Sequence, residues 1–490
     1  MTTKRPPTPP LSHSIQTALL GALGEADPLG HVLHPAQTVE EHGSIIYHLT
    51  SHFESWYAAT KSNTILINVA NKQMIVTKDP AVYEAVLNAP TAENFDTPEA
   101  NHVVFGYFLP HSIFIVENEA WARLRQTGLH IVTKQSLDSI PRLVAQTVEN
   151  LFNTRASSTT WTFEPNDEFP KLTFDIFHHF FYRWQSNAIG NESVSAQHFS
   201  DYSTICNALG SRTALPKPWL WRLPLESNHV VDKARESLLA QVAVLIEERR
   251  KALAANPDID LSTLSIADAL ILEANNGVLT NEELHDTLIS FFVGGFDTTT
   301  GTLSTMLSHL AKYPQVQDEL REALRAAFPR GKEDLAAATP ADIAAVDYLV
   351  WTVDEAMRLV PAIPGLPRAC IKSCTIHGFD IQKGDSILVD STSAAHDPDN
   401  FDGQTDLLDF RPTRYRNATF KPSSSMPFGY GVRSCFGQRY AKTEIQALCA
   451  YIVLGWKISR PADLSLVFDQ NVAVSTRKGH GTLIWEKIVN

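Results

Sequence analysis

The 490-residue sequence predicts a mainly α-helical protein with small β-sheets. Apolar residues at helical spacing dominate the long middle of the chain, up to about Arg368. Runs of β-type residues are short and lie near the two ends of the chain. No internal repeat and no clear linker divides the sequence. We therefore expect residues 41–490 to form a single domain that follows a leader over residues 1–40.

The leader is polar and rich in proline. Lys4 and Arg5 are followed by four prolines before residue 11, which favours an extended, loosely packed or flexible segment. The segment lacks the apolar stretch of a signal peptide, and Ile15–Leu23 is too short to cross a bilayer. At most this segment could lie on a membrane surface.

The elements near the two ends of the domain follow from local patterns. A helical pattern over Ser44–Ala59 precedes two β-rich runs, Thr64–Val69 and Gln73–Val76, which predict a hairpin. The later elements, in chain order, are short strands within Ile371–Val389, a long loop over 397–426, a helix from about Gly437 to Leu454 and strand-like segments to the end.

One helix is predicted to cross the whole domain. Thr280 and Glu283 have the spacing of a capping box, and Pro314 marks the end of the pattern. About 32 residues at a rise of ~1.5 Å give a rod of about 48 Å. Its midpoint, Gly294–Thr300, holds two glycines and three threonines, which are poor helix formers. We expect the helix to open locally there.

Composition excludes several classes of protein. Apolar residues make up 44% and charged residues 19%, so a large core is available and global disorder is excluded. The net charge of −13 argues against a nucleic-acid-binding protein. Five cysteines, an odd number, form no disulfide framework and indicate a reducing compartment. No run of ~18 apolar residues predicts a membrane span.

The cysteine near the C-terminus stands in an unusual context. The segment Pro427–Gly437 has glycines on both sides of Cys435, which permit a tight loop against something flat or bulky. A helix begins directly afterwards, and Arg433 adds positive charge. Helix N–H groups stabilise a thiolate, and a cysteine thiolate is one of the few axial ligands that a haem accepts.

This loop resembles the haem-binding loop of the cytochrome P450 superfamily, with pattern F-x-x-G-x-R-x-C-x-G. Four further family motifs occur in the order and approximate spacing of the family. The loop pattern is filled by Phe428, Gly431, Arg433, Cys435 and Gly437; the other motifs are Trp121-x-x-x-Arg125, Gly294–Thr298, Glu355-x-x-Arg358 and Phe410–Arg414. The resemblance covers roughly residues 40–490 and implies a P450-like fold, with haem between the long helix and the cysteine loop.

The resemblance implies haem b as the cofactor, with Cys435 as its iron ligand and Phe428 and Gly437 shaping the loop. Trp121 and Arg125 share one helix face, where an indole N–H and a guanidinium could hold one propionate. Arg433 and Arg368 are the other implied propionate ligands.

The resemblance implies roles other than propionate binding for five further residues. Glu355 and Arg358, with Arg414, are expected to form a structural network around the cysteine loop. Asp297 and Thr298 match the family's oxygen-activation motif and are expected to order water and relay protons.

The resemblance implies a monooxygenase that inserts one oxygen atom from O2 into a lipophilic small molecule, by hydroxylation or epoxidation, in secondary or lipid metabolism. Because the chain ends soon after Cys435, electrons are expected from a separate ferredoxin or flavoprotein reductase, docking near Arg439 and Lys442. Two alternatives stay open: a haem-thiolate isomerase, dehydratase or peroxygenase that needs no reductase, and a non-catalytic haem sensor. We expect a cytoplasmic protein or, if an N-terminal anchor has been removed, one on the cytosolic face of the endoplasmic reticulum.

The substrate pocket implied by the resemblance is largely apolar. Its predicted lining comes from segments far apart in the sequence, and residues of this type also fill any protein core. The predicted lining residues are Phe105, Phe108, Phe114, Phe291, Phe292, Ile363, Leu366 and Val474.

Overall fold

The computed structural model describes residues 4–9, 50 and 52–488, with gaps at 70–71, 89–93, 135–136, 156–158, 215, 256–263, 419 and 471–472. Helices predominate in this part of the chain, and the strands form small sheets. The predicted fold class is therefore confirmed. The predicted leader lies outside the described residues except for residues 4–9.

The helices account for most of the described chain. The α-helices are α5 (Phe53–Thr60), α6 (Pro80–Asn88), α7 (Glu99–Phe108), α8 (Asn118–Lys134), α9 (Ile140–Arg155), α10 (Pro165–Tyr182), α11 (Ser193–Ala214), α12 (Pro218–Trp221), α13 (Glu226–Ala255), α14 (Ile266–Asn275), α15 (Asn281–Lys312), α16 (Pro314–Ala327), α17 (Lys332–Ala337), α18 (Pro340–Ala344), α19 (Asp347–Leu359), α20 (Ser391–Ala395) and α21 (Gln438–Gly455). Short 3-10 helices are η3 (Pro398–Asn400), η4 (Pro412–Tyr415) and η5 (Gly431–Arg433).

The strands are short and belong to separate sheets. In the largest sheet the order is β1-β2-β8-β5-β3, in which only β2 and β8 run parallel. A second sheet has the order β4-β12-β9, and β6-β7 and β10-β11 are two-stranded. The bounds are β1 (Thr64–Val69), β2 (Lys72–Thr77), β3 (Phe95–Asp96), β4 (Thr160–Phe163), β5 (Gly365–Cys370), β6 (Cys374–Ile376), β7 (Phe379–Ile381), β8 (Ser386–Asp390), β9 (Trp456–Ser459), β10 (Phe468–Gln470), β11 (Val474–Thr476) and β12 (Leu483–Lys487).

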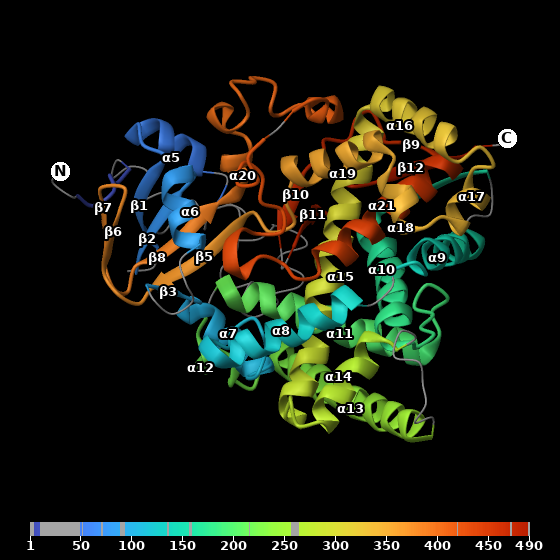
Figure 1. The fold of residues 1–490 in the computed structure, drawn as a ribbon, viewed down its shortest axis with the longest axis horizontal. Coiled ribbons are helices and arrows are strands. Elements are labelled where there is room, and N and C mark those ends of the chain that lie inside the picture. The colour runs from blue at the N-terminus through green and yellow to red at the C-terminus, as the bar shows by residue number, and fades with distance from the viewer. Residues whose placement is uncertain are drawn as a thin grey trace.

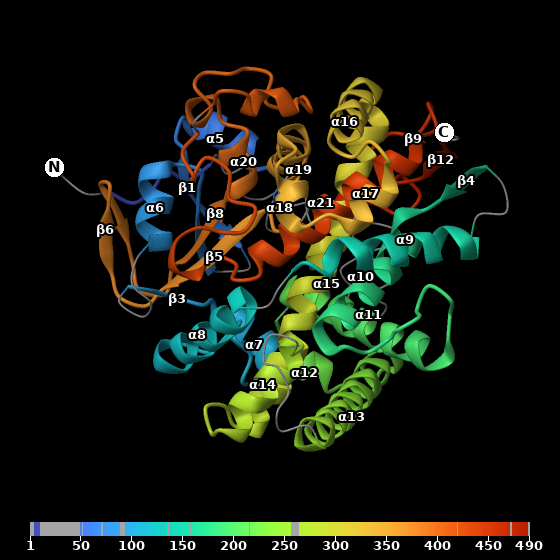
Figure 2. The ribbon, with the colours of Figure 1, turned by 45° about the vertical axis from the view of Figure 1, so that its right-hand side comes forward.

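The largest sheet and the helices occupy different ends of the molecule. Figures 1 and 2 show that sheet, with α5 and α6, at the end where the N-terminus lies, and most helices beyond it. The helix α15 runs through the middle of the helical part, and most of its side chains are buried. Residues on α15 are therefore held rigidly at the centre of the fold.

The long helix has the predicted ends but not the predicted opening. The hydroxyl of Thr280 accepts from the N–H of Glu283, whose carboxylate accepts from the N–H of Thr280, and Pro314 starts α16. However, α15 is continuous across its glycines and threonines, so the predicted opening is wrong. The hydroxyls of Thr298 and Thr299 donate to carbonyl oxygens one turn earlier, at 2.7 and 2.8 Å, and so do not compete with the helix for its N–H groups.

The described start of the chain is extended, as predicted, but it is not loosely packed. The backbone of Lys4 pairs with Phe379 of β7 in a parallel bridge, and Pro6 and Pro9 are buried. The Arg5 guanidinium forms an ion pair with Asp385. Residues 4–9 are thus docked on β7 and its neighbours, which corrects the predicted loose leader for this segment. Within the described residues, no helix combines the length and the apolar character that a membrane span requires.

Candidate active site around Cys435

The loop that carries Cys435 is held in place by backbone contacts. Cys435 follows η5 and precedes α21, and its N–H donates to the carbonyl oxygen of Phe428 at 2.7 Å. Gly431 has a φ of +72°, and a Cβ there would lie 2.2 Å from the carbonyl oxygen of Leu87 on α6. Only glycine therefore permits this loop to pack against α6.

The thiol of Cys435 experiences opposing influences. Crowding by protein atoms raises its pKa above the usual value, whereas the N–H groups of Gly437 and Gln438 and the Arg125 guanidinium oppose that rise. The pKa of the thiol is raised overall, so the N–H groups at the start of α21 do not by themselves produce a thiolate. Binding of a metal ion would remove the proton, because the thiolate is the form that binds metals.

The middle of α15 and the cysteine loop both keep exposed surface. Gly294, Gly295, Asp297 and Thr298 keep partial exposure, although the turns of α15 on either side are buried. Cys435 is likewise exposed even though protein atoms crowd its thiol. The ring of Phe291 on α15 lies 4.8 Å from the ring of Phe436, next to the cysteine. The middle of α15 and the cysteine loop are thus neighbours in the fold.

Three arginines converge beside the cysteine loop. The Arg125 guanidinium donates to the carbonyl oxygen of Ser434 at 2.7 Å, and Arg368 donates to that of Pro367 at 2.8 Å. Burial lowers the pKa of Arg125, Arg368 and Arg433, and that of Arg368 falls to about 10, with repulsion from Arg433 as a second cause. The three guanidinium groups here have the carboxylates of Glu117 and Asp96 as neighbours, so an anionic ligand would balance the remaining positive charge.

Trp121 lies within reach of two of these arginines. Its ring centroid is 4.5 Å from the Cζ of Arg433 and 5.6 Å from the Cζ of Arg125. The structure thus brings together Trp121, Arg125 and Arg433, which the sequence motifs linked only through the family resemblance.

These residues fit a haem. The sulfur of Cys435 is a soft metal ligand, and the surplus of guanidinium groups matches a group that carries carboxylates. Haem has both an iron atom and two propionates, so the donor set and the charge of this region are suited to it.

The predicted network of Glu355, Arg358 and Arg414 is present and has no exposed side chain. The carboxylate of Glu355 accepts from both Arg358, at 2.8 and 3.0 Å, and Arg414, at 2.7 Å. Arg358 also donates to the carbonyl oxygens of Ala395 and Leu407. The network joins α19, η4 and the loop before η4, and it lies within the long segment that leads to Cys435.

Asp297 and Thr298 are adjacent, but both have partners within the protein. The carboxylate of Asp297 accepts from the N–H of Ala473 at 2.8 Å, and the Thr298 hydroxyl donates to the carbonyl oxygen of Gly294 at 2.7 Å. Burial raises the pKa of Asp297 to about 6, although the Ala473 N–H opposes the shift. The carboxyl group of Asp297 is therefore a weaker acid than an ordinary aspartic acid side chain.

The predicted pocket residues divide into two sets. Phe108, Phe291, Phe292 and Val474 are buried, and Phe292 has no exposed surface and lies among aromatic rings of α10 and α11. All four pack within the described core, and Val474 lies on the strand β11 rather than on a helix. The partly exposed set, which can face a ligand, is Phe105, Phe114, Ile363 and Leu366.

Gly295 has a structural role that the sequence did not reveal. A Cβ at this position would lie 2.4 Å from the ring of Phe177 on α10. A Cβ on the neighbouring Gly294 would lie 3.3 Å from the ring of Phe114. The two glycines therefore let α15 approach aromatic rings on different sides.

Glu117 is a site residue that sequence reasoning missed. It precedes α8 and forms an ion pair with Arg433, and both side chains are largely buried, with 12% and 13% exposed. Its position four residues before Trp121, hence near the same helix face, was the available signal. That signal is weak, because acidic residues are common at helix starts.

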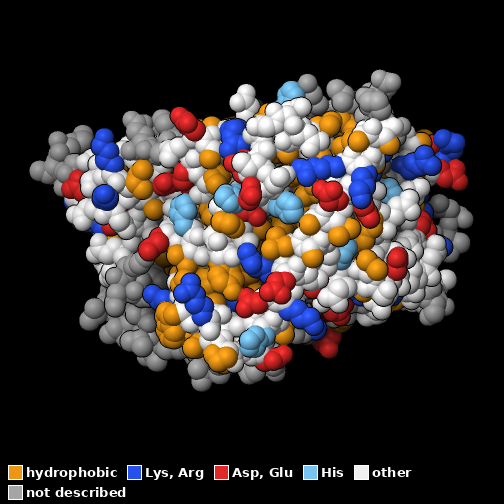
Figure 3. Space-filling model, turned by 90° about the horizontal axis from the view of Figure 1, so that it is seen from below, with side chains coloured by type: hydrophobic (Ala, Val, Ile, Leu, Met, Phe, Trp, Pro, Cys, Tyr) orange, Lys and Arg blue, Asp and Glu red, His pale blue; other side chains and the backbone are white. Residues whose placement is uncertain are grey.

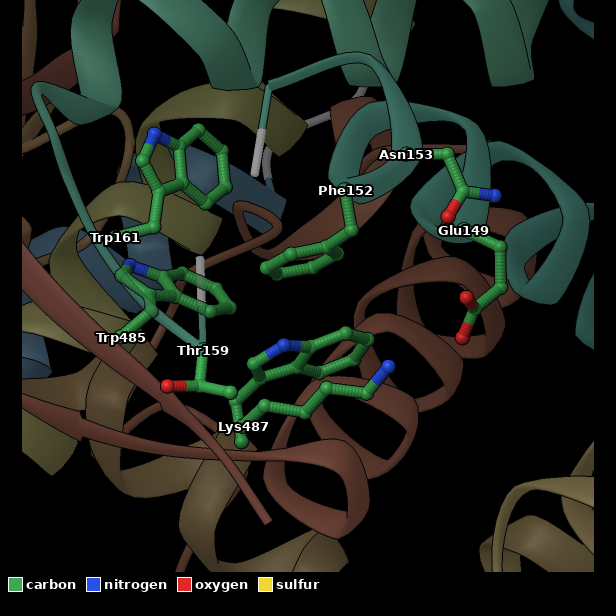
Figure 4. Close-up of a pocket in the computed structure, with 8 residues that line it drawn as sticks. Glu149, Phe152, Asn153, Thr159, Trp161, Trp485 and Lys487 are labelled. Carbon is green, nitrogen blue, oxygen red and sulfur yellow. The ribbon is translucent and has the colours of Figure 1, made fainter. Parts of the chain in front are cut away.

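A hollow of about 120 Å³ lies elsewhere, between α9 and the sheet of β4, β9 and β12. Figure 4 shows its aromatic lining, which includes Phe152, Trp161 and Trp485. The rings of Phe152 and Trp456 stack at 3.7 Å. None of the predicted site residues lines this hollow, so it is separate from the candidate site.

Hydrophobic side chains also reach the outer surface. In Figure 3 they gather in one area of the lower face, beside Lys and Arg side chains. Trp219 on α12 is 63% exposed, and Leu223 and Val230 close to it are exposed as well. Figure 1 places α12 next to α7 on this lower side. An apolar outer surface thus lies near the helix that carries Phe105.

Comparison with known proteins places the whole fold in one family. A family model described as Cytochrome P450 matches residues 46–482. A cytochrome P450 haem domain of known structure superposes with a TM-score of 0.77 at 15% identity, covering 100% of this chain and 98% of that one. This structural likeness shows the fold.

Curated relatives match parts of the chain. A (1S)-1-hydroxy-luvungin A synthase from Citrus sinensis is 29% identical over 59% of this chain and 56% of its own length. A mitochondrial sterol 26-hydroxylase from Mus musculus is 25% identical over 72% of this chain and 68% of its own length. The chain spans about a third to two thirds of the length of the curated relatives it matches.

Proposed function

This chain belongs to the cytochrome P450 family, and from that premise we propose that it is a haem-thiolate monooxygenase that acts on a lipophilic small molecule. The family implies a haem cofactor, and we propose haem b. The observation that carries the proposal is the position of Cys435, at the start of α21 and beside three arginines with lowered pKa. When bound, the haem supplies the activation of O2.

The proposed binding roles follow from the contacts. Cys435 ligates the iron, and the N–H groups of Gly437 and Gln438 lower the charge on its sulfur. Arg125, Arg368 and Arg433, with Trp121, bind the propionates. Phe428 supports the loop through its carbonyl oxygen, which accepts from the cysteine N–H.

Asp297 and Thr298 are the proposed proton-relay residues. A carboxyl group with a pKa of about 6 takes up and releases a proton at physiological pH. The Thr298 hydroxyl, which donates to the Gly294 carbonyl oxygen, can turn towards a water molecule instead. Gly294, Gly295, Asp297 and Thr298 keep partial exposure, which supports access of water to this turn of α15.

The proposed substrate is apolar, and its oxidation is a hydroxylation or an epoxidation in secondary or lipid metabolism. The rings of Phe105 and Phe114 lie 5.1 Å apart, and a Cβ on Gly294 would approach Phe114 closely, so both rings are near the middle of α15. Ile363 and Leu366 add apolar surface. The name of the sterol hydroxylase agrees with a lipophilic substrate.

Electrons are proposed to come from a separate ferredoxin or flavoprotein reductase. Arg439 and Lys442 lie on the first turns of α21, directly after the cysteine loop. Lys442 forms an ion pair with Asp354 at 3.0 Å, so its charge is partly compensated in the resting protein. Arg439 is exposed, which supports a contribution to an acidic partner's docking.

The decisive experiment is the carbon monoxide difference spectrum of the reduced protein and of Cys435→Ser. The parent protein is expected to give the red-shifted Soret band of thiolate-ligated haem, and the variant to lose it. Cys374→Ser, at a partly exposed cysteine on β6, is the control and should behave like the parent. A parent protein with only the unshifted band contradicts the proposal.

A second measurement separates the enzyme classes. With a substrate found by spin-state shifts, product formation should require a reductase and NAD(P)H. Product formation without any electron donor would instead support an isomerase, dehydratase or peroxygenase.

A further inference from the structure

Glu117 lies in a cluster of charged groups contributed by different elements. Among the described residues, those that face it are Asp96 of β3, His102 of α7, Arg368 of β5 and Arg433 of η5. One ligand atom each from Asp96, His102 and Glu117 lies within 4.8 Å of the others. Two of the three arginines of the candidate haem site thus border a group of acidic side chains.

The contacts of Glu117 are specific. Its carboxylate forms the ion pair with Arg433 and accepts from the N–H of Thr97 at 3.3 Å. The N–H of Thr97 also donates to Asp96 at 2.7 Å, so the two carboxylates share one donor. The guanidinium group of Arg433 is therefore paired with a protein carboxylate, although it is also one of the groups that could bind a propionate.

We propose that Glu117 is a positioning residue for Arg433 and that haem binding is coupled to the uptake of one proton by Glu117. As a charged carboxylate, Glu117 holds Arg433 and repels a propionate. As a neutral acid, it leaves the charge of Arg433 to the propionate. This inference rests on the proposed haem site.

The linkage between haem binding and protonation of Glu117 determines the direction in which haem affinity changes with pH. Burial raises the pKa of Glu117 to about 7, a hydrogen bond with Asp96 adds to the rise, and the charge of Arg433 opposes it. A propionate nearby would raise the pKa of Glu117 further. The contribution of Glu117 to haem affinity is thus constant below about pH 7 and decreases above it, by up to about tenfold per pH unit until the higher pKa is passed.

Cys435 contributes an effect of the opposite sign. Its thiol must lose a proton to ligate iron, so ligation becomes more favourable as the pH rises. The comparison of two proteins that share Cys435 and differ only at Glu117 cancels this contribution.

The test measures haem loss from the holoprotein into an excess of apomyoglobin, followed by the Soret band between pH 6 and 9. For Glu117→Gln, which resembles the neutral acid, we expect the same rate as the parent at pH 6 and a rate about 3–10-fold slower at pH 8.5. Glu119→Gln, which removes the same charge from an exposed position on α8, should follow the parent at every pH. A ratio of rates that does not change with pH overturns the proposal.

A second variant keeps the test open if Glu117→Gln does not fold. Asp96→Asn removes the hydrogen bond that raises the pKa of Glu117, so the rise in the haem-loss rate should begin at a lower pH than in the parent. If the haem-loss rate of this variant begins to rise at the same pH as that of the parent, haem binding is not coupled to protonation of Glu117. If the purified parent binds no haem, the proposed function itself has failed, which this assay reveals before any variant is compared.

Discussion

Two groups of arginines in this protein, one fully buried and one partly buried, differ in how their charge is compensated. In the structural network, Arg358 and Arg414 share the carboxylate of Glu355 and donate further hydrogen bonds to carbonyl oxygens. Beside the cysteine loop, Arg125 and Arg368 donate to backbone carbonyls, and the ion pair there is that of Arg433.

The difference shows which group is complete without a ligand. Burying a charge is unfavourable unless a partner of opposite charge and hydrogen bonds compensate for it. The network meets that requirement with protein atoms alone. Arg125 and Arg368 meet it in part, because the partners to which they donate are uncharged carbonyl oxygens, and burial lowers the pKa of both. The same residue type thus serves folding in one region and is suited to ligand binding in the other.

The largest expected effect comes from breaking the network. Glu355→Gln would leave two fully buried guanidinium groups without their carboxylate, so we expect a loss of about 3–5 kcal/mol in the free energy of unfolding. Urea unfolding followed by tryptophan fluorescence measures the loss. An unchanged urea midpoint would show that the network does not stabilise the fold.

The second-largest effect is expected for Arg368→Gln, which should change haem binding without lowering the stability of the fold. Arg368→Gln removes a charge that Arg433 repels, so the haem-free variant should be as stable as the parent or more stable by about 1 kcal/mol. Haem loss should be at least about tenfold faster, because a charge-assisted hydrogen bond is missing. Arg222→Gln at an exposed position is the control for both assays. A variant with lower stability and an unchanged rate of haem loss would show that Arg368 serves folding and not ligand binding.

The smallest effect is expected at the rim of the network. Asp406 pairs with Arg411 at 2.6 Å and with Arg414 at 3.5 Å, and its side chain is 35% exposed. Water can therefore replace much of its contribution, and Asp406→Asn should lower the free energy of unfolding by less than about 1 kcal/mol. The same urea assay checks this value, and a loss near that of Glu355→Gln would mean that the network extends to its rim.

The sequence determined those parts of the fold that depend on local signals. The ends of α15 follow from the capping box at Thr280 and from Pro314, and the β1–β2 hairpin follows from two β-branched runs with a short connection. The cysteine loop was recognisable because its glycines are tied to backbone geometry, as Gly431 shows by its approach to Leu87.

Features that depend on distant segments were not accessible in this way. The strands β3 and β4 are short, and each is defined by a partner far along the chain. Phe292 has the spacing of a pocket residue, but its aromatic neighbours on α10 and α11 make it part of the core. Glu117 gains its role only through Arg433, more than 300 positions later. Such contacts cannot be read from one segment alone.

The docking of residues 4–9 has a consequence for synthesis on the ribosome. Lys4 and Arg5 bind residues between Gly378 and Asp385, so this segment is synthesised long before the partners to which it binds. At about 5–20 residues per second this delay is roughly 20–75 s. During that time the segment is accessible to chaperones and proteases. Its docking on β7 is therefore a late step in the folding of the nascent chain.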